Sequence, residues 1–449
     1  MIELMDMRVK EMMNELIFSK KNANVTDNEW TIYKENIMDE ISRMNQALKT
    51  EYSDEHCSIY LPFDDLILKE ISYLVEKKQL LHPEYIIVVG IGGSNLGTIA
   101  VQEAILGKMY NQKNPKTKIV YADTVDSDQI NDIIELIEPV LKNDKNIIIC
   151  GISKSGGTTE TIANFEVLMD ILERYKQNPE EYVVTITDKD SKFWHLAKEK
   201  RYSILEIPKK VGGRFSVFSP VGLFPLAMIG INVADLIAGA KEMVKRCLNN
   251  DINDNPAAVS AALIYHHYLN KKNIHDLFLF NTDFESIGKW YRQLMAESIG
   301  KEFNRDEERI FTGITPTVSI GSIDLHSMAQ LYLGGPNDKF TTFVHVDKNK
   351  NEITLPNIAE YNELVKGIQS RKMKEIMDAI FNGTKNAFEH GKRPFIEINL
   401  PDKSEESIGQ FLQMKMMEMM FLGALMRVNT FDQPNVEAYK IETKKILET

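Results

Sequence analysis

The chain of 449 residues has few cysteines and no recognisable metal-binding pattern. Cys57, Cys150 and Cys247 are its only cysteines, and no two of them have the spacing of a metal or redox site. His266 and His267 are adjacent rather than one helical turn apart, and no His-Glu-x-x-His motif occurs. The sequence therefore predicts no metal, and its low cysteine content suits a reducing cytosol.

Positive charge is also in deficit, with 53 Lys and Arg against 65 Asp and Glu, a net charge of -12. This balance disfavours a nucleic-acid partner. Residues 1–6 contain acidic side chains where a secretory signal has a basic start. The methionine-rich stretch 411–426 contains Lys415 and Glu418, so we expect a buried helix there rather than a membrane span. These features together predict a cytoplasmic protein without a membrane partner.

Complete nucleotide-binding motifs are missing as well. Gly92 and Gly97 have the glycine spacing of a P-loop, but Thr98 stands where the lysine of that motif belongs. Residues 90–95 lack the last glycine of the dinucleotide fingerprint, and no Gly-x-Ser-x-Gly motif indicates a serine hydrolase. ATP and NAD are therefore disfavoured, and we expect no cofactor.

Two loops rich in small residues are present instead. Residues 90–94 (Gly-Ile-Gly-Gly-Ser) follow the apolar run 86–89, and residues 153–159 (Ser-Lys-Ser-Gly-Gly-Thr-Thr) follow the apolar run 147–150. Such runs are typical of buried parallel strands, and glycines at their carboxyl ends let the main chain approach an anion. A simple strand-to-helix connection does not need the hydroxyl groups and the lysine that these loops also contain. The pair of loops predicts a site for a phosphate group, with a sugar phosphate as the expected ligand.

The order of apolar and helical segments predicts an α/β fold with two doubly wound parallel-sheet lobes in tandem and helices on both faces of each sheet. Strand-like runs lie near 86–91, 118–123, 146–151, 182–187 and 202–207, and a second series lies near 277–280, 318–320, 343–346 and 396–398. We expect a helical N-terminal segment at 1–80 that packs on the lobes, a first lobe at 81–230, a second lobe at 231–427, and a C-terminal turn and helix at 428–449.

Four ionisable side chains are candidates for chemistry, although each has a simpler local interpretation. Glu297 and Gln293 share one face of a predicted helix, where a glutamate is commonly only solvated. His326 lies near a predicted helix start, where it suits either acid–base chemistry or a structural hydrogen bond. Arg214 follows two glycines that leave room for a ligand, whereas Lys440 alone is indistinguishable from a surface lysine.

Two segments give a specific resemblance. Residues 212–223 (Gly-Gly-Arg-Phe-Ser-Val-Phe-Ser-Pro-Val-Gly-Leu) and 433–440 (Gln-Pro-Asn-Val-Glu-Ala-Tyr-Lys) resemble the two signatures of the glucose-6-phosphate isomerase (phosphoglucose isomerase) family. The resemblance extends over nearly the whole chain and is to the shorter, bacterial form. It implies two sugar-isomerase (SIS) lobes, in agreement with the periodicity. Gly157 departs from the pattern, since related loops often have threonine there, and Asn95 replaces a common aromatic residue.

The resemblance also implies roles for individual residues. The substrate phosphate would be bound by Gly93, Ser94, Ser153, Lys154, Ser155 and Thr158. Glu297 would carry a proton between sugar carbons C2 and C1, with Gln293 positioning the substrate and Arg214 stabilising a cis-enediolate. His326 and Lys440 would open the sugar ring, and His326 would reach the site of a neighbouring subunit in a homodimer.

The activity implied is the reversible interconversion of glucose 6-phosphate and fructose 6-phosphate in glycolysis and gluconeogenesis. Two alternatives stay open at this point. One is a protein that senses a phosphosugar with its SIS lobes without converting it. The other is an isomerase of broader scope that also accepts mannose 6-phosphate, because the sequence does not determine stereochemistry at C2.

Overall fold

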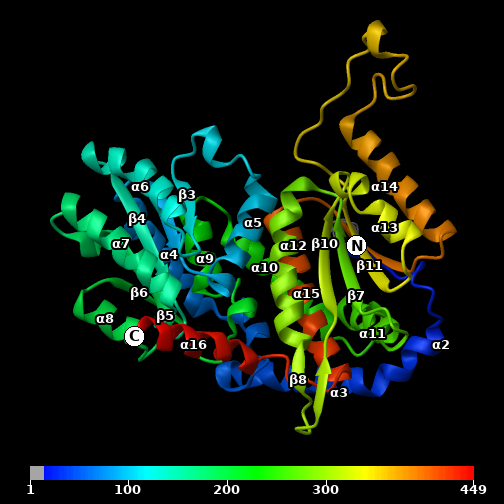
Figure 1. Cartoon of the computed structure of the whole chain (residues 1–449), viewed down its shortest axis with the longest axis horizontal. Coiled ribbons are helices and arrows are strands. Elements are labelled where there is room, and N and C mark those ends of the chain that lie inside the picture. Colours follow the sequence, from blue (N-terminus) through cyan, green and yellow to red (C-terminus); the bar gives the residue numbers. More distant parts are fainter. Residues whose placement is uncertain (1–14) are drawn as a thin grey trace, which may run out of the picture.

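The computed structural model describes residues 15–449 and contains two five-stranded sheets that lie side by side (Figure 1). Residues 1–14 of the expected helical N-terminal segment lie outside the described residues. Both sheets consist mainly of parallel strands with helices on both faces. The predicted fold class, two α/β lobes in tandem, is confirmed.

The first sheet has the strand order β3-β2-β4-β5-β6, and all of its neighbouring strands are parallel. The strands are β2 (Pro83–Val89), β3 (Lys118–Ala122), β4 (Asn146–Ile152), β5 (Val183–Asp188) and β6 (Ser203–Ile207). One face is covered by α6 (Ser127–Lys142), α7 (Thr159–Tyr175) and α8 (Lys192–Glu199), and the other by α4 (Asp65–Gln79), α5 (Leu96–Leu106) and α9 (Pro220–Met228). Because both faces are covered, these strands show the uninterrupted apolar runs from which they were predicted.

The second sheet has the order β1-β12-β11-β7-β10. Its parallel strands are β7 (Ile274–Leu279), β10 (Thr315–Ile320), β11 (Lys339–Val346) and β12 (Phe395–Leu400), at the positions predicted from the second apolar series. One face is covered by α13 (Ala329–Gly334) and α14 (Met373–His390), and the other by α11 (Pro256–Leu269), α12 (Glu285–Ile299) and α15 (Glu405–Leu425).

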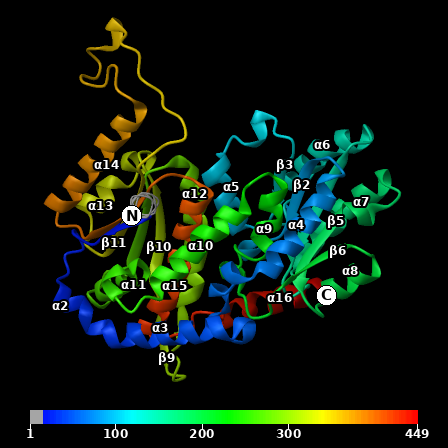
Figure 2. The same ribbon diagram turned by 180° about the vertical axis from the view of Figure 1, so that it is seen from behind.

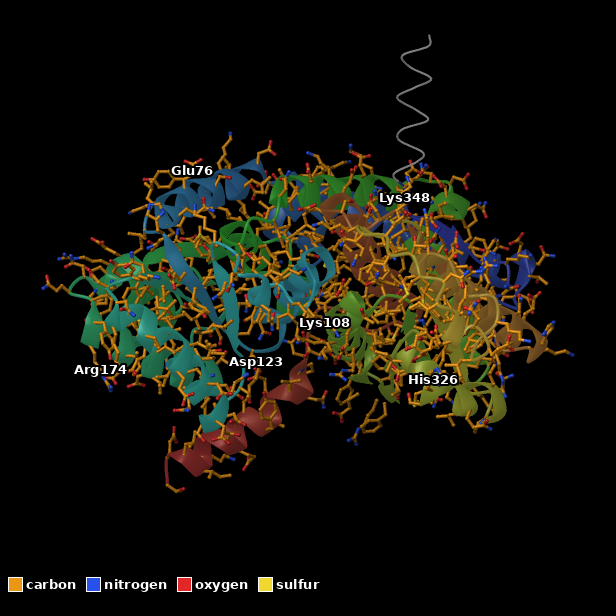
Figure 3. All side chains as sticks on the ribbon, turned by 90° about the horizontal axis from the view of Figure 1, so that it is seen from above. Glu76, Lys108, Asp123, Arg174, His326 and Lys348 are labelled. Carbon is orange, nitrogen blue, oxygen red and sulfur yellow. The ribbon has the colours of Figure 1, made fainter. Side chains whose placement is uncertain are left out.

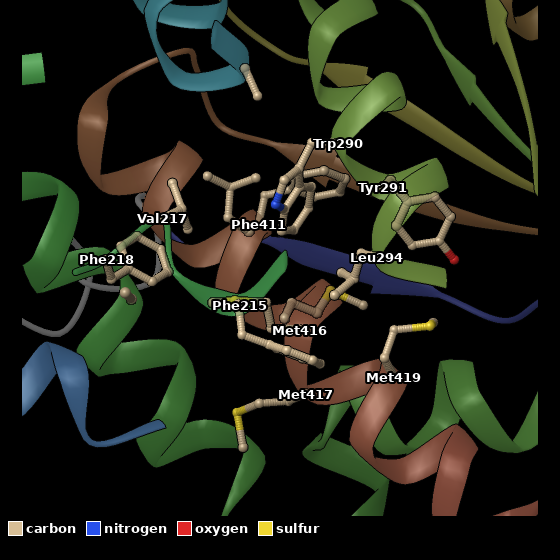
Figure 4. Close-up of a cluster of buried hydrophobic side chains, with 14 of the residues drawn as sticks. Phe215, Val217, Phe218, Trp290, Tyr291, Leu294, Phe411, Met416, Met417 and Met419 are labelled. Atoms are coloured by element: carbon tan, nitrogen blue, oxygen red, sulfur yellow. The ribbon is translucent and has the colours of Figure 1, made fainter. Parts of the chain in front are cut away.

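The lobes meet along buried helices. Helix α5 of the first lobe packs against α12, and α15 packs against α11 and α10 (Val233–Cys247). Figure 4 shows Met416 and Met419 of α15 near Leu294 of α12, in a buried cluster that also contains Met417 and Trp290. Flexible methionine side chains fill irregular space between helices well. The methionine-rich stretch is thus the buried helix that we expected, and among residues 15–449 no helix is long and apolar enough to cross a membrane.

The N-terminal segment contains a strand that its helical pattern does not predict. Strand β1 (Ile17–Ser19) pairs antiparallel with β12 at the edge of the second sheet. Three residues are too few for alternation to show in a sequence, and hydrogen bonds to β12 fix this strand instead. After it come α2 (Asp27–Trp30) and α3 (Lys34–Lys49), and Figure 2 shows α3 running below the lobes toward the first one.

Two further elements lie close to the candidate site. A hairpin of β8 (Lys301–Phe303) and β9 (Arg309–Thr312), absent from the prediction, follows α12 directly. At the C-terminus a 3-10 turn at Pro434–Val436 leads into α16 (Glu437–Leu447). Helix α16 runs from the junction of the lobes to α8 (Figure 1) and has no buried residue.

Candidate active site

The two loops of small residues lie next to each other at the carboxyl edge of the first sheet. Val88 is paired with Cys150 and Val89 with Gly151, so β2 and β4 end at the same level. A Cβ atom added to Gly90 would lie 3.1 Å from the carbonyl oxygen of Ile152. The carboxyl edge of a parallel sheet is where α/β proteins bind ligands.

The first loop packs against the turn that carries Arg214. A Cβ atom added to Gly93 would lie 2.3 Å from the carbonyl carbon of Gly213, so only glycine fits at this approach. Ser216 Oγ donates a hydrogen bond of 3.2 Å to the Gly93 carbonyl. Ser94 ends the 3-10 turn of this loop, just before α5. Loop and turn therefore form one unit.

The second loop contains hydroxyl groups at the start of a long helix. Ser153 is 1% exposed, and its Oγ lies 3.1 Å from Oγ1 of Thr158, the residue that precedes the first turn of α7. Gly156 has φ +68°, and a Cβ atom there would lie 2.6 Å from the amide nitrogen of Phe193. A left-handed glycine thus folds the loop back onto α8. Free amide groups in the first turn of α7 add donors for an anion.

Lys154 leaves this loop on a different side. Its side chain borders a cleft of about 760 Å³ together with Asp188 and Ser191. Burial raises the pKa of Asp188 to about 6, although the positive charge of Lys154 acts to lower that pKa. Ser155 borders this cleft and also the next one, in which Thr158 lies. The structure therefore separates the charge of Lys154 from the hydroxyl group of Thr158.

Lys440 lies opposite the second loop. Together with Ser155, Gly157 and Thr158 it borders a cleft of about 600 Å³ between the loop and α16. Its Nζ donates a 2.7 Å hydrogen bond to Oε1 of Glu437, one turn earlier in the helix. The C-terminal helix thus brings a lysine to the second loop.

Arg214 is the centre of the polar network. The residue is 2% exposed, and every nitrogen of its guanidinium group donates a hydrogen bond. Its acceptors are Ser298 Oγ (2.9 Å), Glu297 Oε2 (3.2 Å), Gln433 Oε1 (2.8 Å), the Asp432 carbonyl (3.2 Å) and the Thr430 carbonyl. Burial lowers the pKa of Arg214, whereas the carboxylates of Glu297 and Asp432 raise it. An arginine in this setting stays charged.

Glu297 contacts both Arg214 and Gln293, and Gln293 lies on the same face of α12 as Glu297. Gln293 Nε2 donates a 3.0 Å hydrogen bond to Glu297 Oε1, while Arg214 contacts the other carboxylate oxygen. The spacing of four residues places both side chains on one face, as the sequence predicted. Gln293 also lies against the first loop, since a Cβ atom at Gly92 would lie 3.1 Å from Gln293 Nε2. Its Oε1 is buried and has no partner within residues 15–449.

Several residues of the network escaped the sequence analysis. Gln433 lies in the second signature segment, residues 433–440, and Ser298 follows Glu297 directly. Their positions in the sequence could therefore have indicated both residues. The carbonyl groups of Thr430 and Asp432 had none, because any residue has a carbonyl. Lys301 on β8 is also part of the site, since its Nζ lies 2.8 Å from Oδ1 of Asp432.

His326 lies apart from this network. It ends the 3-10 turn that follows β10, and its side chain is exposed. Figure 3 shows it on the side of the second lobe, far from α16. In the part of the chain that the structure describes, the side chain of His326 has no hydrogen bond, ion pair or ring contact. The chain thus brings together Arg214, Gln293 and Glu297, and Lys440 with the second loop, but does not bring His326 to either group.

The network has the parts needed to move a proton next to a developing negative charge. The Glu297 side chain is 30% exposed and able to meet a ligand, whereas the Arg214 side chain beside it is 1% exposed and fixed. A carboxylate takes up and returns protons, and a fixed guanidinium stabilises an oxyanion. In residues 15–449 no group of three or more His, Cys, Asp or Glu side chains has the arrangement of a metal site.

Comparison with known proteins gives consistent matches. The family described as phosphoglucose isomerase matches residues 78–449. The chain is 33% identical over 371 residues to the glucose-6-phosphate isomerase of Carboxydothermus hydrogenoformans, covering 81% of this chain and 79% of that one. It is 34% identical over 387 residues to the glucose-6-phosphate isomerase of Methanocaldococcus jannaschii, covering 86% and 88%.

Two solved structures resemble the fold along most of the chain. A hypothetical protein of Thermus thermophilus has a TM-score of 0.87 with 26% identity, covering 97% of this chain and all of that one. A glucose-6-phosphate isomerase of Chlamydia trachomatis has a TM-score of 0.83 with 19% identity, covering 96% and 88%. At 19% identity, the similarity to the second structure supports the fold only.

Proposed function

Because the chain belongs to the phosphoglucose isomerase family, we propose that the two loops and the Arg214 network bind glucose 6-phosphate and fructose 6-phosphate and interconvert them. The protein is an isomerase of sugar phosphates. The observation that carries the assignment of the site is the contact between Glu297 and Arg214, because it pairs a proton acceptor with a fixed positive charge beside the first loop.

Phosphate binding is assigned to the hydroxyl groups and helix start of the second loop. Ser153, Ser155 and Thr158 offer donors there, and Ser94 offers one from the adjacent first loop. Hydrogen bonds to a charged group contribute about 1.5–3 kcal/mol each, so a few of them anchor a phosphate dianion. Lys154 adds positive charge from the neighbouring cleft.

The proton transfer is assigned to Glu297. Its carboxylate removes the proton from C2 of the open-chain aldose, the electron pair forms a C1–C2 double bond, and the carbonyl oxygen takes the negative charge. Arg214 stabilises this enediolate oxygen, and Gln293 holds the carboxylate in position. After a proton moves between the two oxygens, Glu297 returns its proton to C1 and the ketose forms.

Ring opening is a separate step and needs its own acid–base groups. We assign it to Lys440, which faces the second loop, and to His326. Since His326 is exposed and makes no contact with Glu297 within one chain, its role requires a homodimer in which it enters the partner's site. A cytoplasmic location accords with the phosphorylated substrate and the three unpaired cysteines.

Turnover of fructose 6-phosphate by the purified protein, measured as glucose 6-phosphate formed in the presence of EDTA, tests this proposal. We expect conversion that the chelator does not reduce. If the protein binds fructose 6-phosphate but produces no glucose 6-phosphate, the isomerase proposal fails and the protein senses a phosphosugar instead.

A further inference from the structure

A buried histidine outside the Arg214 network lies between two carboxylates. His56 is 7% exposed, with Nε2 2.7 Å from Oε1 of Glu40 and Nδ1 2.8 Å from Oδ1 of Asp54. Glu40 is 1% exposed and lies on α3, whereas the Asp54 side chain is 47% exposed. The main-chain amide of His56 also donates to Asp54 Oδ1, at 2.8 Å. The imidazole ring is therefore fixed on both sides.

This arrangement requires a protonated ring. An ionised carboxylate only accepts hydrogen bonds, so both ring nitrogens must donate, and an imidazole donates from both only when it is charged. Burial alone would lower the pKa of His56, but the hydrogen bonds and charges of Glu40 and Asp54 outweigh burial and raise it. His56 thus keeps its proton to a higher pH than an ordinary histidine.

Other charged groups in the surroundings act on the two carboxylates. Arg43 Nη1 donates a 2.8 Å hydrogen bond to Glu40, and Arg305 adds positive charge near it. Lys210 has the same effect on Asp54 and donates to the Ser53 carbonyl, at 2.6 Å. The neighbouring thiol of Cys57 is buried, and burial raises its pKa to about 12, so it stays neutral. Contacts with His56 lower the pKa of Glu40 and of Asp54 most, and Arg43, Arg305 and Lys210 add to that effect.

One aromatic residue links His56 to Arg214. The His56 ring meets the Phe431 ring edge to face, with centroids 4.7 Å apart, and Phe431 also contacts Phe215, with centroids 5.6 Å apart. Phe431 lies between Thr430 and Asp432, whose carbonyl groups accept hydrogen bonds from Arg214. Phe431 therefore connects the His56 ring to the segment that carries two acceptors of the guanidinium group.

We propose that His56 is a positioning residue for the isomerase reaction, whose charged ring holds Phe431 and thereby the Arg214 guanidinium in the orientation that stabilises the enediolate. The inference rests on the proposed function. When His56 loses its proton, one ring nitrogen becomes an acceptor that faces a carboxylate, so the ring turns and Phe431 loses its support. His56 does not touch the substrate, so its state alters kcat and leaves KM almost unchanged.

The pH profile of kcat distinguishes this role from a merely structural one. In Glu40→Gln the pKa of His56 falls, so the alkaline decline of kcat should begin about one pH unit lower than in the wild type. Asp54→Asn should shift the decline in the same direction, and because Asp54 is half exposed, this variant tests the idea even if Glu40→Gln does not fold. Asp39→Asn, an equal change of charge at an exposed position of α3, serves as the control.

A signal independent of turnover completes the test. The NMR resonance of the Arg214 Nε–H, assigned by its loss in Arg214→Lys, should move with the titration of His56 in each protein. If the profiles and the Arg214 signal of Glu40→Gln and Asp54→Asn coincide with those of Asp39→Asn, the positioning role is wrong. An inactive wild type would overturn the proposed function, whereas the Arg214 signal would still report on His56.

Discussion

Arg214 joins two signature segments and α12 through its hydrogen bonds, so its shape matters as much as its charge. Lysine has the same charge but a single nitrogen, and it is not able to reach five acceptors. We expect Arg214→Lys to reduce kcat/KM for fructose 6-phosphate by about 10²–10³, as found when an oxyanion donor is removed. The free energy of unfolding should fall by about 1–3 kcal/mol because a buried carbonyl loses its donor.

Steady-state kinetics and urea unfolding measure both effects. Arg309→Lys is a matched control, because the Arg309 side chain is 63% exposed and lies on the nearby β9. If Arg214→Lys retains wild-type kcat/KM, a positive charge alone is sufficient at this position and the hydrogen-bond geometry has no catalytic importance.

The two neighbouring glycines of the second loop are expected to differ in their tolerance of substitution. Gly156 has a left-handed conformation and lies against the main chain of Phe193, whereas no atom lies within 4 Å of a Cβ added to Gly157. Gly156→Ala should therefore raise KM for fructose 6-phosphate about tenfold or more, because the loop must move. Gly157→Thr adds a hydroxyl group in open space and should leave KM unchanged or lower it. Equal effects of the two substitutions would contradict this view of the loop.

At the scale of elements, His267 of α11 ties down the chain that follows β1. His267 is 4% exposed, its Nε2 lies 2.8 Å from the Ala23 carbonyl, and its ring stacks on Phe340. Burial lowers the pKa of His267 from 6.5 to about 4. Below about pH 6.5 the unfolded chain takes up a proton that the folded chain refuses until about pH 4, so stability is lost across this range as pH falls.

We therefore expect His267 to reduce the free energy of unfolding by about 2 kcal/mol between about pH 7 and about pH 5. His267→Gln retains a donor for the Ala23 carbonyl but does not titrate, so it should lose less stability over the same interval. Urea unfolding of both proteins at the two pH values measures how much stability each loses. All other titrating groups contribute the same loss in both proteins, so the difference between the two losses is due to His267. Parallel losses in the two proteins would show that His267 is not the group responsible.

Elements with a strong local pattern were predictable from the sequence, and those held by distant partners were not. The strand at Ile147–Ile149 is apolar along its length because both of its faces are buried, and that pattern is visible without a structure. Strand β1 has no such pattern and depends on β12, which lies more than 370 residues later. The strands of hairpin β8–β9, with three and four residues, are also too short for such a pattern.

The candidate site shows the same division. The spacing of Gln293 and Glu297 on one helix face follows from local sequence, but a role for Glu297 required the family resemblance. Arg214 contacts the main-chain carbonyl groups of Thr430 and Asp432. Because every residue has a carbonyl group, this tertiary contact does not select particular residue types at positions 430 and 432, and the sequence does not reveal it. The position of the Lys154 side chain was not predictable either, since the loop sequence does not indicate which of two clefts the side chain borders.

At the scale of the whole molecule, the separation of His326 from Glu297 makes a direct prediction about assembly. If His326 acts in the partner's site, Glu297→Gln and His326→Ala variants should each be inactive alone, yet a refolded mixture should regain activity. Random pairing would give about a quarter of wild-type activity, because half of the dimers are mixed and each has one intact site. A mixture that stays inactive would place His326 outside the site or within its own chain.

The most direct test of the account is fructose 6-phosphate turnover in D₂O by wild type, Glu297→Gln and Glu285→Gln. Glu285 begins the same helix as Glu297, and its side chain is 40% exposed, so it provides the matched control. We expect wild type and Glu285→Gln to form glucose 6-phosphate with solvent deuterium at C2, because the base exchanges its proton with solvent. Glu297→Gln should bind fructose 6-phosphate but lose turnover by about 10³ or more. Undiminished turnover and deuterium incorporation in Glu297→Gln would contradict the assignment of Glu297 as the base.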